Sequence, residues 1–347
     1  VNVMLKTTTV GCHVPHCPRH YVNKPNDSFI MKYNTRTQSD GVDDLITRLI
    51  GEGNLAGHAS FIRIEKLYQV ARCIKIQEAI GLDIISEGEL GRDIYYSYFK
   101  EFLEKNESGQ LHLTKNQTTE DFKTAKIFTD KPIKMTIPGP CTLASVFLSS
   151  GIANESFESL STALAECVRE EITTLYEEGC RHIQIDEPIF TTYPIHAKSF
   201  GIDLLTHCFG DRPQLRKYLH ICRNYQSNID GPPRRGQEQR LYEPLADKLN
   251  SSCVDVLSIE DAALQNSSEV FAATKDKFLM LGVCNVGITK VECASDIAER
   301  VSEIAQIRGN SNIILSPDCG FLFLDYQSAI KKMQAIVESR DLLQDLL

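Results

Sequence analysis

The sequence predicts an α/β protein, a (β/α)8 barrel with extended loops after its strands. Short runs of β-branched and apolar residues alternate with longer helical patterns, which is typical of parallel βα units. Polar residues capable of chemistry stand at the carboxyl ends of nearly all these runs, where barrel enzymes carry their active sites. A length of 347 residues suits one large barrel, so we expect residues 1–347 to form a single catalytic domain.

Eight runs fit the buried strands of a parallel sheet: residues 7–13, 83–89, 134–140, 182–188, 217–222, 254–260, 278–285 and 312–319. Between them apolar residues recur at three- and four-residue spacing, most clearly over 60–80 and 155–178. We expect these segments to be helices that cover the sheet from outside. The less regular segments, 14–57, 100–130, 190–215 and 223–240, mostly follow strands and are expected to form the rim of the active site.

The composition indicates a soluble protein whose partners are small molecules. The net charge is −9 and the pI is near 5.6, which argues against a nucleic-acid partner because binding phosphates calls for a basic face. No apolar run approaches the roughly 18 residues of a membrane span, and the first residues do not read as a signal peptide. Twelve cysteines without a secretion signal suggest a reducing compartment. We therefore expect a cytoplasmic protein that binds neither membranes nor nucleic acid, and the sequence leaves its oligomeric state open.

The residues at the predicted strand ends are the candidates for chemistry. A single acid at such a place can equally be a helix cap or a salt-bridge partner. Their concentration at one end of so many strands favours an active site instead. They are Cys12, Glu87, Glu89, Asp186, Glu187, His220, Cys222, Glu260, Asp318 and Cys319.

Four of these residues predict a zinc site. His220 and Cys222 are two apart on one strand, so their side chains point to the same face. Glu260 ends the next strand and Cys319 follows the last one. Zinc prefers about four nitrogen, sulfur and oxygen donors in a tetrahedron, and an ion with one displaceable ligand would acidify a substrate thiol. The alternatives are a histidine satisfied within the core beside unrelated thiols, and a closed structural zinc site.

Motifs spread over most of the chain then give a specific resemblance. They are TTTVG, QEAIGLDIISEGE, IPGPCTL, HIQIDEP, HICRNY, VDVLSIED, LGVCNVGITKVE and SPDCGF. In order and spacing they resemble the catalytic C-terminal barrel of the cobalamin-independent methionine synthase family, including its single-barrel members and the related epoxyalkane:coenzyme M transferases. The resemblance implies a barrel of the type shared by uroporphyrinogen decarboxylase and methionine synthase. It also implies that His220, Cys222, Glu260 and Cys319 are zinc ligands.

The resemblance further implies a pocket for the amino acid homocysteine. Glu89 and Asp186 match the family's two carboxylates that hold the substrate ammonium, and paired carboxylates suit an ammonium in a partly dry cleft. Val10, Gly11 and Cys12 match the segment whose backbone contacts the substrate carboxylate, with Cys12 in the place of the family's serine.

Two departures from the family pattern bear on the methyl donor. The chain has no tryptophan, whereas the long methionine synthases carry one in the loop after strand three, against which the pterin packs. Gly287 stands where those enzymes have a proton-donating histidine. Because a pterin leaves poorly unless it is protonated, loss of this acid should cost on the order of a hundredfold in rate with that donor. Methylfolate, methylcobalamin and an epoxide therefore all stay open as donors.

Two further groups have competing interpretations. Arg92 and Arg223 could bind an anionic substrate group bidentately, or could simply be salt-bridge partners. One loop gathers several side chains that could extend the zinc site, hold a second metal or line the substrate, and its spacing matches no zinc-finger pattern. These are Cys12, His13, His16, Cys17 and His20.

Three functions remain in competition. The first is a zinc-dependent S-methyltransferase of methionine biosynthesis, in which Glu89 and Asp186 hold a homocysteine-like thiol and the metal activates its sulfur. The second keeps the metal and the thiol but takes an epoxide as the electrophile, or runs in reverse as a carbon–sulfur lyase. The third is an inactive barrel that binds zinc or a thiol for sensing or storage.

Overall fold

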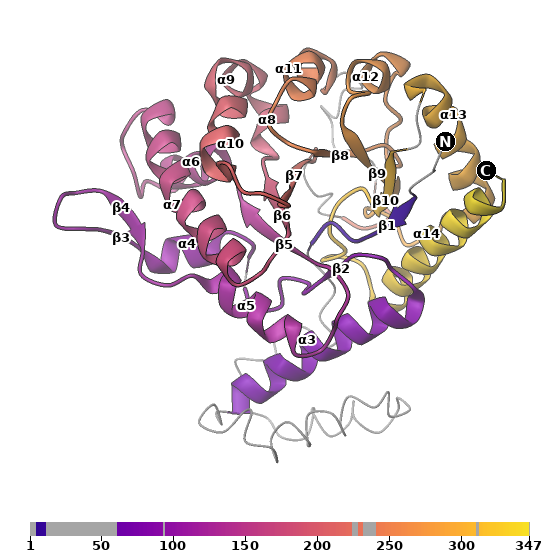
Figure 1. Ribbon diagram of the computed structural model, residues 1–347, viewed down its shortest axis with the longest axis horizontal. Helices are drawn as coiled ribbons and strands as arrows, with labels where there is room; N and C mark the ends of the chain where they lie inside the picture. The colour runs from indigo at the N-terminus through magenta and orange to yellow at the C-terminus, as the bar shows by residue number, and fades with distance from the viewer. Residues whose placement is uncertain are drawn as a thin grey trace.

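Eight parallel strands form one sheet at the centre of the molecule, with helices around it (Figure 1). The structure is a computed structural model that describes residues 5–11, 61–92, 94–223, 228–231, 241–309 and 312–346. Neighbouring strands follow the order β1, β10, β9, β8, β7, β6, β5, β2. The strands are β1 (Lys6–Thr7), β2 (Ile85–Ser86), β5 (Ile133–Pro138), β6 (His182–Asp186), β7 (Arg216–Ile221), β8 (Val256–Glu260), β9 (Phe278–Cys284) and β10 (Ile313–Pro317).

The first and last strands in this order are joined by hydrogen bonds, which closes the sheet into a barrel. The backbone N–H groups of Asp83 and Ile84 donate to the Thr7 carbonyl at 3.2 and 3.1 Å. The Thr8 hydroxyl donates to the Ile84 carbonyl at 3.0 Å. All eight predicted strands are present, and the predicted (β/α)8 barrel is confirmed.

Strand β2 is shorter than the run 83–89 that predicts it. Only Ile85 and Ser86 pair in the sheet. Beyond them Gly88 and Glu89 both have positive φ, 82° and 55°, so the chain turns away from the strand direction. A positive φ is uncommon for a residue with a side chain and is often found at functional sites. The turn therefore sets where the Glu89 carboxylate points.

Helices surround the barrel and pack on their neighbours in a ring, with α14 against α3, α3 against α5, and α5 against α7 (Figure 1). The predicted helices at 60–80 and 155–178 are confirmed as α3 and α7. The helices are α3 (Phe61–Ile80), α4 (Ser97–Phe102), α5 (Gln117–Lys126), α6 (Pro140–Ser149), α7 (Phe157–Glu177), α8 (Ile189–Thr192), α9 (Pro194–His196), α10 (Ile202–Phe209), α11 (Ala246–Asn250), α12 (Ser268–Ala273), α13 (Ala294–Arg308) and α14 (Tyr326–Leu346), with a π-helical turn at Ala197–Gly201 and a 3-10 turn at Glu243–Leu245.

Helix α7 shows how local sequence fixes these elements. The Ser156 hydroxyl caps its first turn by accepting from the Ser159 N–H at 3.2 Å. Leu164, Val168 and Ile172 recur at four-residue spacing and are fully buried. The apolar stripe lies against the barrel layer, and the helix ends just before a glycine turn.

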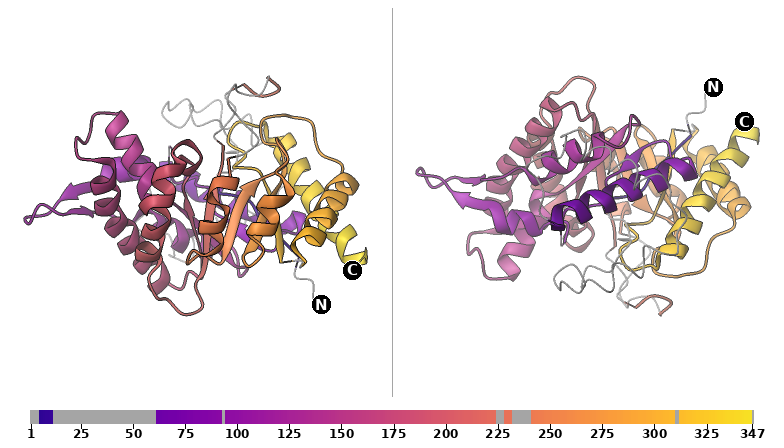
Figure 2. Two further views of the ribbon diagram at one scale, coloured as in Figure 1. Left: turned by 90° about the horizontal axis from the view of Figure 1, so that it is seen from above. Right: turned by 90° about the horizontal axis from the view of Figure 1, so that it is seen from below.

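Two of the segments expected to be irregular contain regular structure. Within 100–130 the strands β3 (Leu103–Lys105) and β4 (Leu111–Leu113) form an antiparallel hairpin that projects from the barrel (Figure 2). Within 190–215 helix α10 packs on α7 and buries Ile202, Leu205 and Phe209. Their three- and four-residue spacing is the signal for this helix. None of the described helices is long and apolar enough to cross a membrane.

Candidate active site

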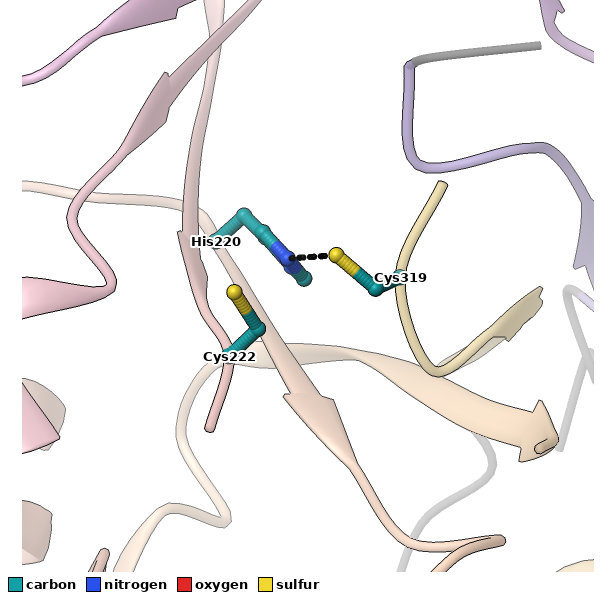
Figure 3. A group of neighbouring side chains, drawn as sticks. All are labelled: His220, Cys222 and Cys319. Atoms are coloured by element: carbon teal, nitrogen blue, oxygen red, sulfur yellow. Dashed lines mark hydrogen bonds between the residues drawn. The ribbon is translucent and has the colours of Figure 1, made fainter. Parts of the chain in front are cut away.

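Three of the four predicted metal ligands lie together at the carboxyl end of the barrel strands. His220 belongs to β7, Cys222 directly follows β7, and Cys319 follows β10 (Figure 3). The ligand atoms of these three side chains all lie within 4.8 Å of one another, and all three residues are buried. His220 and Cys319 are 99 positions apart in the sequence. Together with Cys222 they bring two sulfur atoms and one imidazole nitrogen to the same point.

The separation of two of these atoms fits neighbouring ligands of a tetrahedral metal ion. His220 Nε2 lies 3.6 Å from Cys319 Sγ, the contact drawn in Figure 3. With metal–sulfur and metal–nitrogen bonds of about 2.3 and 2.1 Å, two ligands of a tetrahedral zinc lie roughly 3.5 to 3.8 Å apart. A set of one imidazole and two thiols is also the soft donor set that zinc prefers. The residues present therefore fit a zinc ion.

The imidazole of His220 is oriented by the neighbouring strand. Its Nδ1 lies 2.8 Å from the Ser258 hydroxyl on β8, which leaves Nε2 directed at Cys319. A hydrogen bond to one ring nitrogen commonly orients a histidine that ligates metal through the other. Burial is the largest single influence on the pKa of His220 and lowers it, but the charge of Cys222, a hydrogen bond with Cys222 and the charge of Asp186 together raise it, so the net shift is upward.

Glu260, the fourth predicted ligand, lies outside the group of three. Its Oε1 accepts the backbone N–H of Arg223 at 3.1 Å, directly after Cys222. Burial is the main cause that raises the pKa of Glu260, and the charge of Cys222 adds to it. Glu260 is therefore near enough to Cys222 to feel its charge, and its described hydrogen bond holds the backbone that carries this cysteine.

Asp318, the residue before Cys319, fixes the backbone on the other side of the group. Its two carboxylate oxygens accept the backbone N–H groups of Asp261, Ala262 and Ala263 at 2.7 to 3.0 Å. A Cβ at Gly282 would overlap the Asp318 carboxylate, so the close approach needs a glycine there. The loops after β8 and β10 are thereby tied together beside Cys319.

The two predicted substrate carboxylates come from other parts of the barrel mouth, Asp186 from the end of β6 and Glu89 from the turn after β2. Glu89 Oε1 accepts the Thr136 hydroxyl at 2.7 Å. Asp186 Oδ1 accepts the Gln184 side-chain N–H at 2.7 Å. Glu89 and Asp186 are only 4% and 8% exposed. Gly11 lies against the first of them, because a Cβ at Gly11 would lie 2.5 Å from Glu89 Oε1.

The metal group and the carboxylate pair are neighbours. Asp186 and His220 are register partners on the adjacent strands β6 and β7. Burial raises the pKa of Asp186 to about 7, with Glu89 adding to the rise while His220 and Lys134 oppose it. Each of the two groups therefore lies within the electrostatic reach of the other, at one edge of the barrel.

Other predicted residues have structural partners. Arg92 donates to Glu87 at 2.8 Å and lies 3.4 Å from Asp121, and Arg223 donates to Asn266 at 2.7 Å and to the Leu264 carbonyl at 3.1 Å. Arg92 is thus a salt-bridge partner, as one of its two interpretations had it, whereas the described hydrogen-bond partners of the Arg223 side chain are uncharged oxygens.

Glu187 and Gly287 also take part in local hydrogen bonding. Glu187 accepts the N–H groups of Cys141 and Thr142, both at 2.9 Å, and so caps helix α6. Gly287 lies in the turn after β9, where its N–H donates to the Asn285 side chain at 2.8 Å. Glycine offers no side-chain acid at this place. The predicted loop residues Cys12, His13, His16, Cys17 and His20 lie outside the described residues.

Several residues near the site were not predicted from the sequence. Ser258 orients His220, and Lys134 and Gln184 lie beneath Asp186. The pKa of Tyr95 is raised by burial and by the charges of Cys222 and Asp186. The available signals were a lysine inside the apolar run KMTIP and a glutamine two residues before Asp186.

Comparisons with known proteins place the chain in a family. Residues 59–203 and 239–341 match the family described as the catalytic domain of cobalamin-independent synthase. A methionine synthase from Methanocaldococcus jannaschii is 28% identical over 81% of this chain and 90% of its own length. A 5-methyltetrahydropteroyltriglutamate–homocysteine methyltransferase from Thermosynechococcus vestitus is 22% identical over 78% of this chain but only 37% of its own length.

Solved structures agree on the fold. A B12-independent methionine synthase from Shewanella sp. W3-18-1 superposes with a TM-score of 0.77 at 22% identity, covering 99% of this chain and 98% of its own. A putative vitamin-B12-independent methionine synthase from Listeria monocytogenes superposes with a TM-score of 0.66 at 19% identity, covering 98% and 96%. The resemblance indicated by the sequence motifs is thus confirmed, and because the family match spans most of its length, the chain belongs to the cobalamin-independent synthase catalytic-domain family.

Proposed function

We propose that this chain is a zinc-dependent S-methyltransferase that transfers a methyl group to the sulfur of homocysteine or a closely related amino thiol. In this proposal residues 1–347 act as one catalytic barrel. The single observation that carries it is the register pairing of Asp186 with His220, which sets a buried carboxylate pair beside a His/Cys/Cys group. Names given to the relatives, methionine synthase and homocysteine methyltransferase, agree with it.

The sulfur of the substrate would enter on the metal side of the site. His220, Cys222 and Cys319 would hold the zinc, and Glu260 is proposed as a fourth, displaceable ligand. When bound, zinc supplies a Lewis acid that lowers the pKa of a coordinated thiol. Ser258 keeps His220 Nε2 directed inward, and Asp318 keeps the loop that carries Cys319 in place.

The amino group of the substrate would bind on the carboxylate side. Glu89 and Asp186 are both buried, and a charge-assisted hydrogen bond to an ammonium is stronger in such surroundings than in water. Gly11 leaves room for the Glu89 carboxylate and brings backbone close to the same pocket. Holding both ends of the amino thiol fixes the position of its sulfur, which is where orientation contributes to rate.

The donor is proposed to be a methyl compound whose leaving group does not depend on an acid at residue 287. Gly287 uses its N–H in a local turn and offers no proton from a side chain. This observation also favours a second candidate function modestly, an epoxide-opening thiol transferase, in which the electrophile makes different demands on an acid.

Transfer of isotope from labelled donors tests the proposal. Zinc-loaded protein is incubated with homocysteine and, separately, with methyl-labelled methyltetrahydrofolate, its polyglutamate form and methylcobalamin. We expect label in methionine from at least one donor, and none when Cys319 is replaced by serine. If no donor gives labelled methionine and the protein instead catalyses the addition of thiols to an epoxide, the methyltransferase proposal is wrong and the second candidate function is supported.

A further inference from the structure

Lys134 is a charged residue in the interior of the barrel. It lies on β5, two residues before Thr136, so the two side chains point to the same face of the strand. Thr136 contacts the inward-facing Glu89, which places Lys134 inside the barrel, below the carboxylate pocket. The residue has no exposed surface. A buried ammonium is retained only where hydrogen bonds and opposite charges compensate its burial.

Two acceptors bind this ammonium. Lys134 Nζ donates to the Val10 carbonyl at 2.7 Å and to Gln184 Oε1. A lysine ammonium has donors and no acceptor, so the atom of the Gln184 amide that faces it must be the oxygen. The orientation of the Gln184 side chain is therefore set by Lys134.

The orientation of Gln184 in turn acts on Asp186. With its oxygen turned to Lys134, the amide directs its N–H groups to Asp186 Oδ1 at 2.7 Å and to the Val10 carbonyl at 2.9 Å. Asp186 Oδ1 accepts this hydrogen bond, so any proton on the carboxyl is on the other oxygen. The second oxygen, Oδ2, is then the one available to a ligand.

The charges of Lys134, Glu89 and Asp186 also support a role for Lys134 at the carboxylate pair. Glu89 and Asp186 are two buried carboxylates that repel each other, and an adjacent cation reduces the cost of keeping both ionised. Burial lowers the pKa of Lys134, while Asp186 and Glu89 oppose that shift, so all three groups interact. One buried lysine thus lies beside two buried carboxyl groups, and this excess of acidic groups suits a ligand that carries an ammonium.

We propose that Lys134 and Gln184 are positioning residues that adapt the pocket to thiols bearing an α-amino group, by fixing the free oxygen of Asp186 and by balancing the charge of the carboxylate pair. This inference rests on the proposed function, because it assumes that the pocket receives the substrate amino group. It assigns no contact with the sulfur. Losing either residue should therefore weaken recognition of the amino group and leave the metal side intact.

The test compares two thiols that differ only in the amino group, homocysteine and 4-mercaptobutanoate. Dissociation constants are measured by calorimetry on zinc-loaded protein, together with KM and kcat for homocysteine. We expect Lys134→Met and Gln184→Leu each to weaken homocysteine binding by roughly ten- to hundredfold, the range for a hydrogen bond to a charged group. Binding of 4-mercaptobutanoate and the zinc content should stay at the wild-type level, and KM should change far more than kcat.

Lys332→Met is the matched control. Lys332 is also a lysine with no exposed surface, but it pairs with Glu292 on the outer side of the barrel, away from the carboxylate pocket. Its replacement should cost stability without changing the preference between the two thiols. If Lys134→Met fails to fold, Gln184→Leu carries the test, because it keeps the ammonium and its bond to Val10.

The outcomes separate the two proposals. A wild-type protein that binds both thiols equally would remove the amino pocket itself, and the proposed function with it. A wild-type protein that prefers homocysteine, with variants that keep the same preference, would overturn the role of Lys134 and Gln184 alone. A loss of zinc in either variant would show that these residues support the metal side, which also contradicts the inference.

Discussion

The two sides of the candidate site are stabilised in different ways. On the carboxylate side each acid has a partner within the chain: Thr136 donates to Glu89, and Gln184, which itself accepts from Lys134, donates to Asp186. On the sulfur side, two thiols and one imidazole converge within 4.8 Å, and the orienting contact comes from Ser258. The carboxylate side has a compensating cation within the chain, Lys134. The sulfur side offers donor atoms that could hold a metal ion supplied from outside the chain.

This difference predicts that the two sides respond to different perturbations. The donor set should depend on metal, and its substitutions should change sulfur chemistry for every thiol. The carboxylate pocket should depend on charge and pH, and its substitutions should matter only for thiols with an amino group. Each of the following experiments changes one side and measures the other.

Replacement of Cys319 should have the largest effect. In Cys319→Ser we expect zinc affinity and activity to fall by on the order of a thousandfold or more, because a hydroxyl is a far weaker zinc ligand than a thiolate. Zinc content is measured by elemental analysis and activity by methyl transfer. Cys180→Ser is the matched control, since Cys180 is also buried but its thiol donates to the His182 carbonyl at 3.4 Å, at the opposite end of β6 from Asp186. Unchanged zinc content in Cys319→Ser would refute the assignment.

Neutralising Asp186 should have the next largest effect, confined to amino thiols. Asp186→Asn keeps the shape and removes the charge, and loss of a buried charge partner costs about 2 to 4 kcal/mol, or roughly 30- to 1,000-fold in affinity. We expect this loss in homocysteine binding measured by calorimetry, with zinc content unchanged. An equal loss for 4-mercaptobutanoate would mean that Asp186 acts on the sulfur side instead.

Removal of the Ser258 hydroxyl should give an intermediate effect on the metal side. Ser258→Ala leaves Nδ1 of His220 without its 2.8 Å partner, and loss of such an orienting contact lowers metal affinity by about ten- to hundredfold. Competition with a zinc chelator measures it. Ser316→Ala is the control, a buried strand serine whose hydroxyl donates to the Leu281 carbonyl at 3.2 Å and not to a predicted ligand. An equal loss of zinc affinity in both variants would mean that the effect of Ser258→Ala comes from general destabilisation and not from the contact with His220.

The pH dependence should be the smallest effect. Burial raises the pKa of Asp186 to about 7, so the carboxyl gains a proton as the pH falls through that value. Protonation removes the negative charge that attracts the ammonium, so acid weakens homocysteine binding, by at most about tenfold per pH unit for one group. The same titration with 4-mercaptobutanoate corrects for protonation on the metal side. Parallel pH curves for the two thiols would contradict this expectation.

The barrel and the convergence at its mouth could be predicted because they follow from regular patterns. Parallel strands end at the same edge of a sheet, so residues at strand ends, such as His220 and Cys319, must meet there. The paired spacing of His220 and Cys222 fixes their common face. By contrast, the turn at Glu89 shortened β2 in a way that the run SEGE does not reveal, since the change lies in backbone φ.

The support beneath the pocket could not be predicted for a different reason. Lys134 and Val10 are 124 residues apart, and their hydrogen bond depends on the three-dimensional closure of the barrel. The strand 133–138 is buried on both faces, so no alternation marks its inward residues. A lysine within such a strand is the only local hint. Ser258 is likewise an ordinary strand serine until the register pairs it with His220.

The seam between β1 and β2 lies where a bound ligand could stabilise the closure of the barrel. Both strands pair over only two residues, and the seam is joined by contacts of Thr7 and Thr8 with 83–84. Gly11 lies just beyond one of these strands and Glu89 just beyond the other. An amino acid bound between Gly11 and Glu89 would contact both sides of this seam and so stabilise the closed barrel. Occupancy of the pocket should accordingly slow amide exchange at this join more than elsewhere in the sheet.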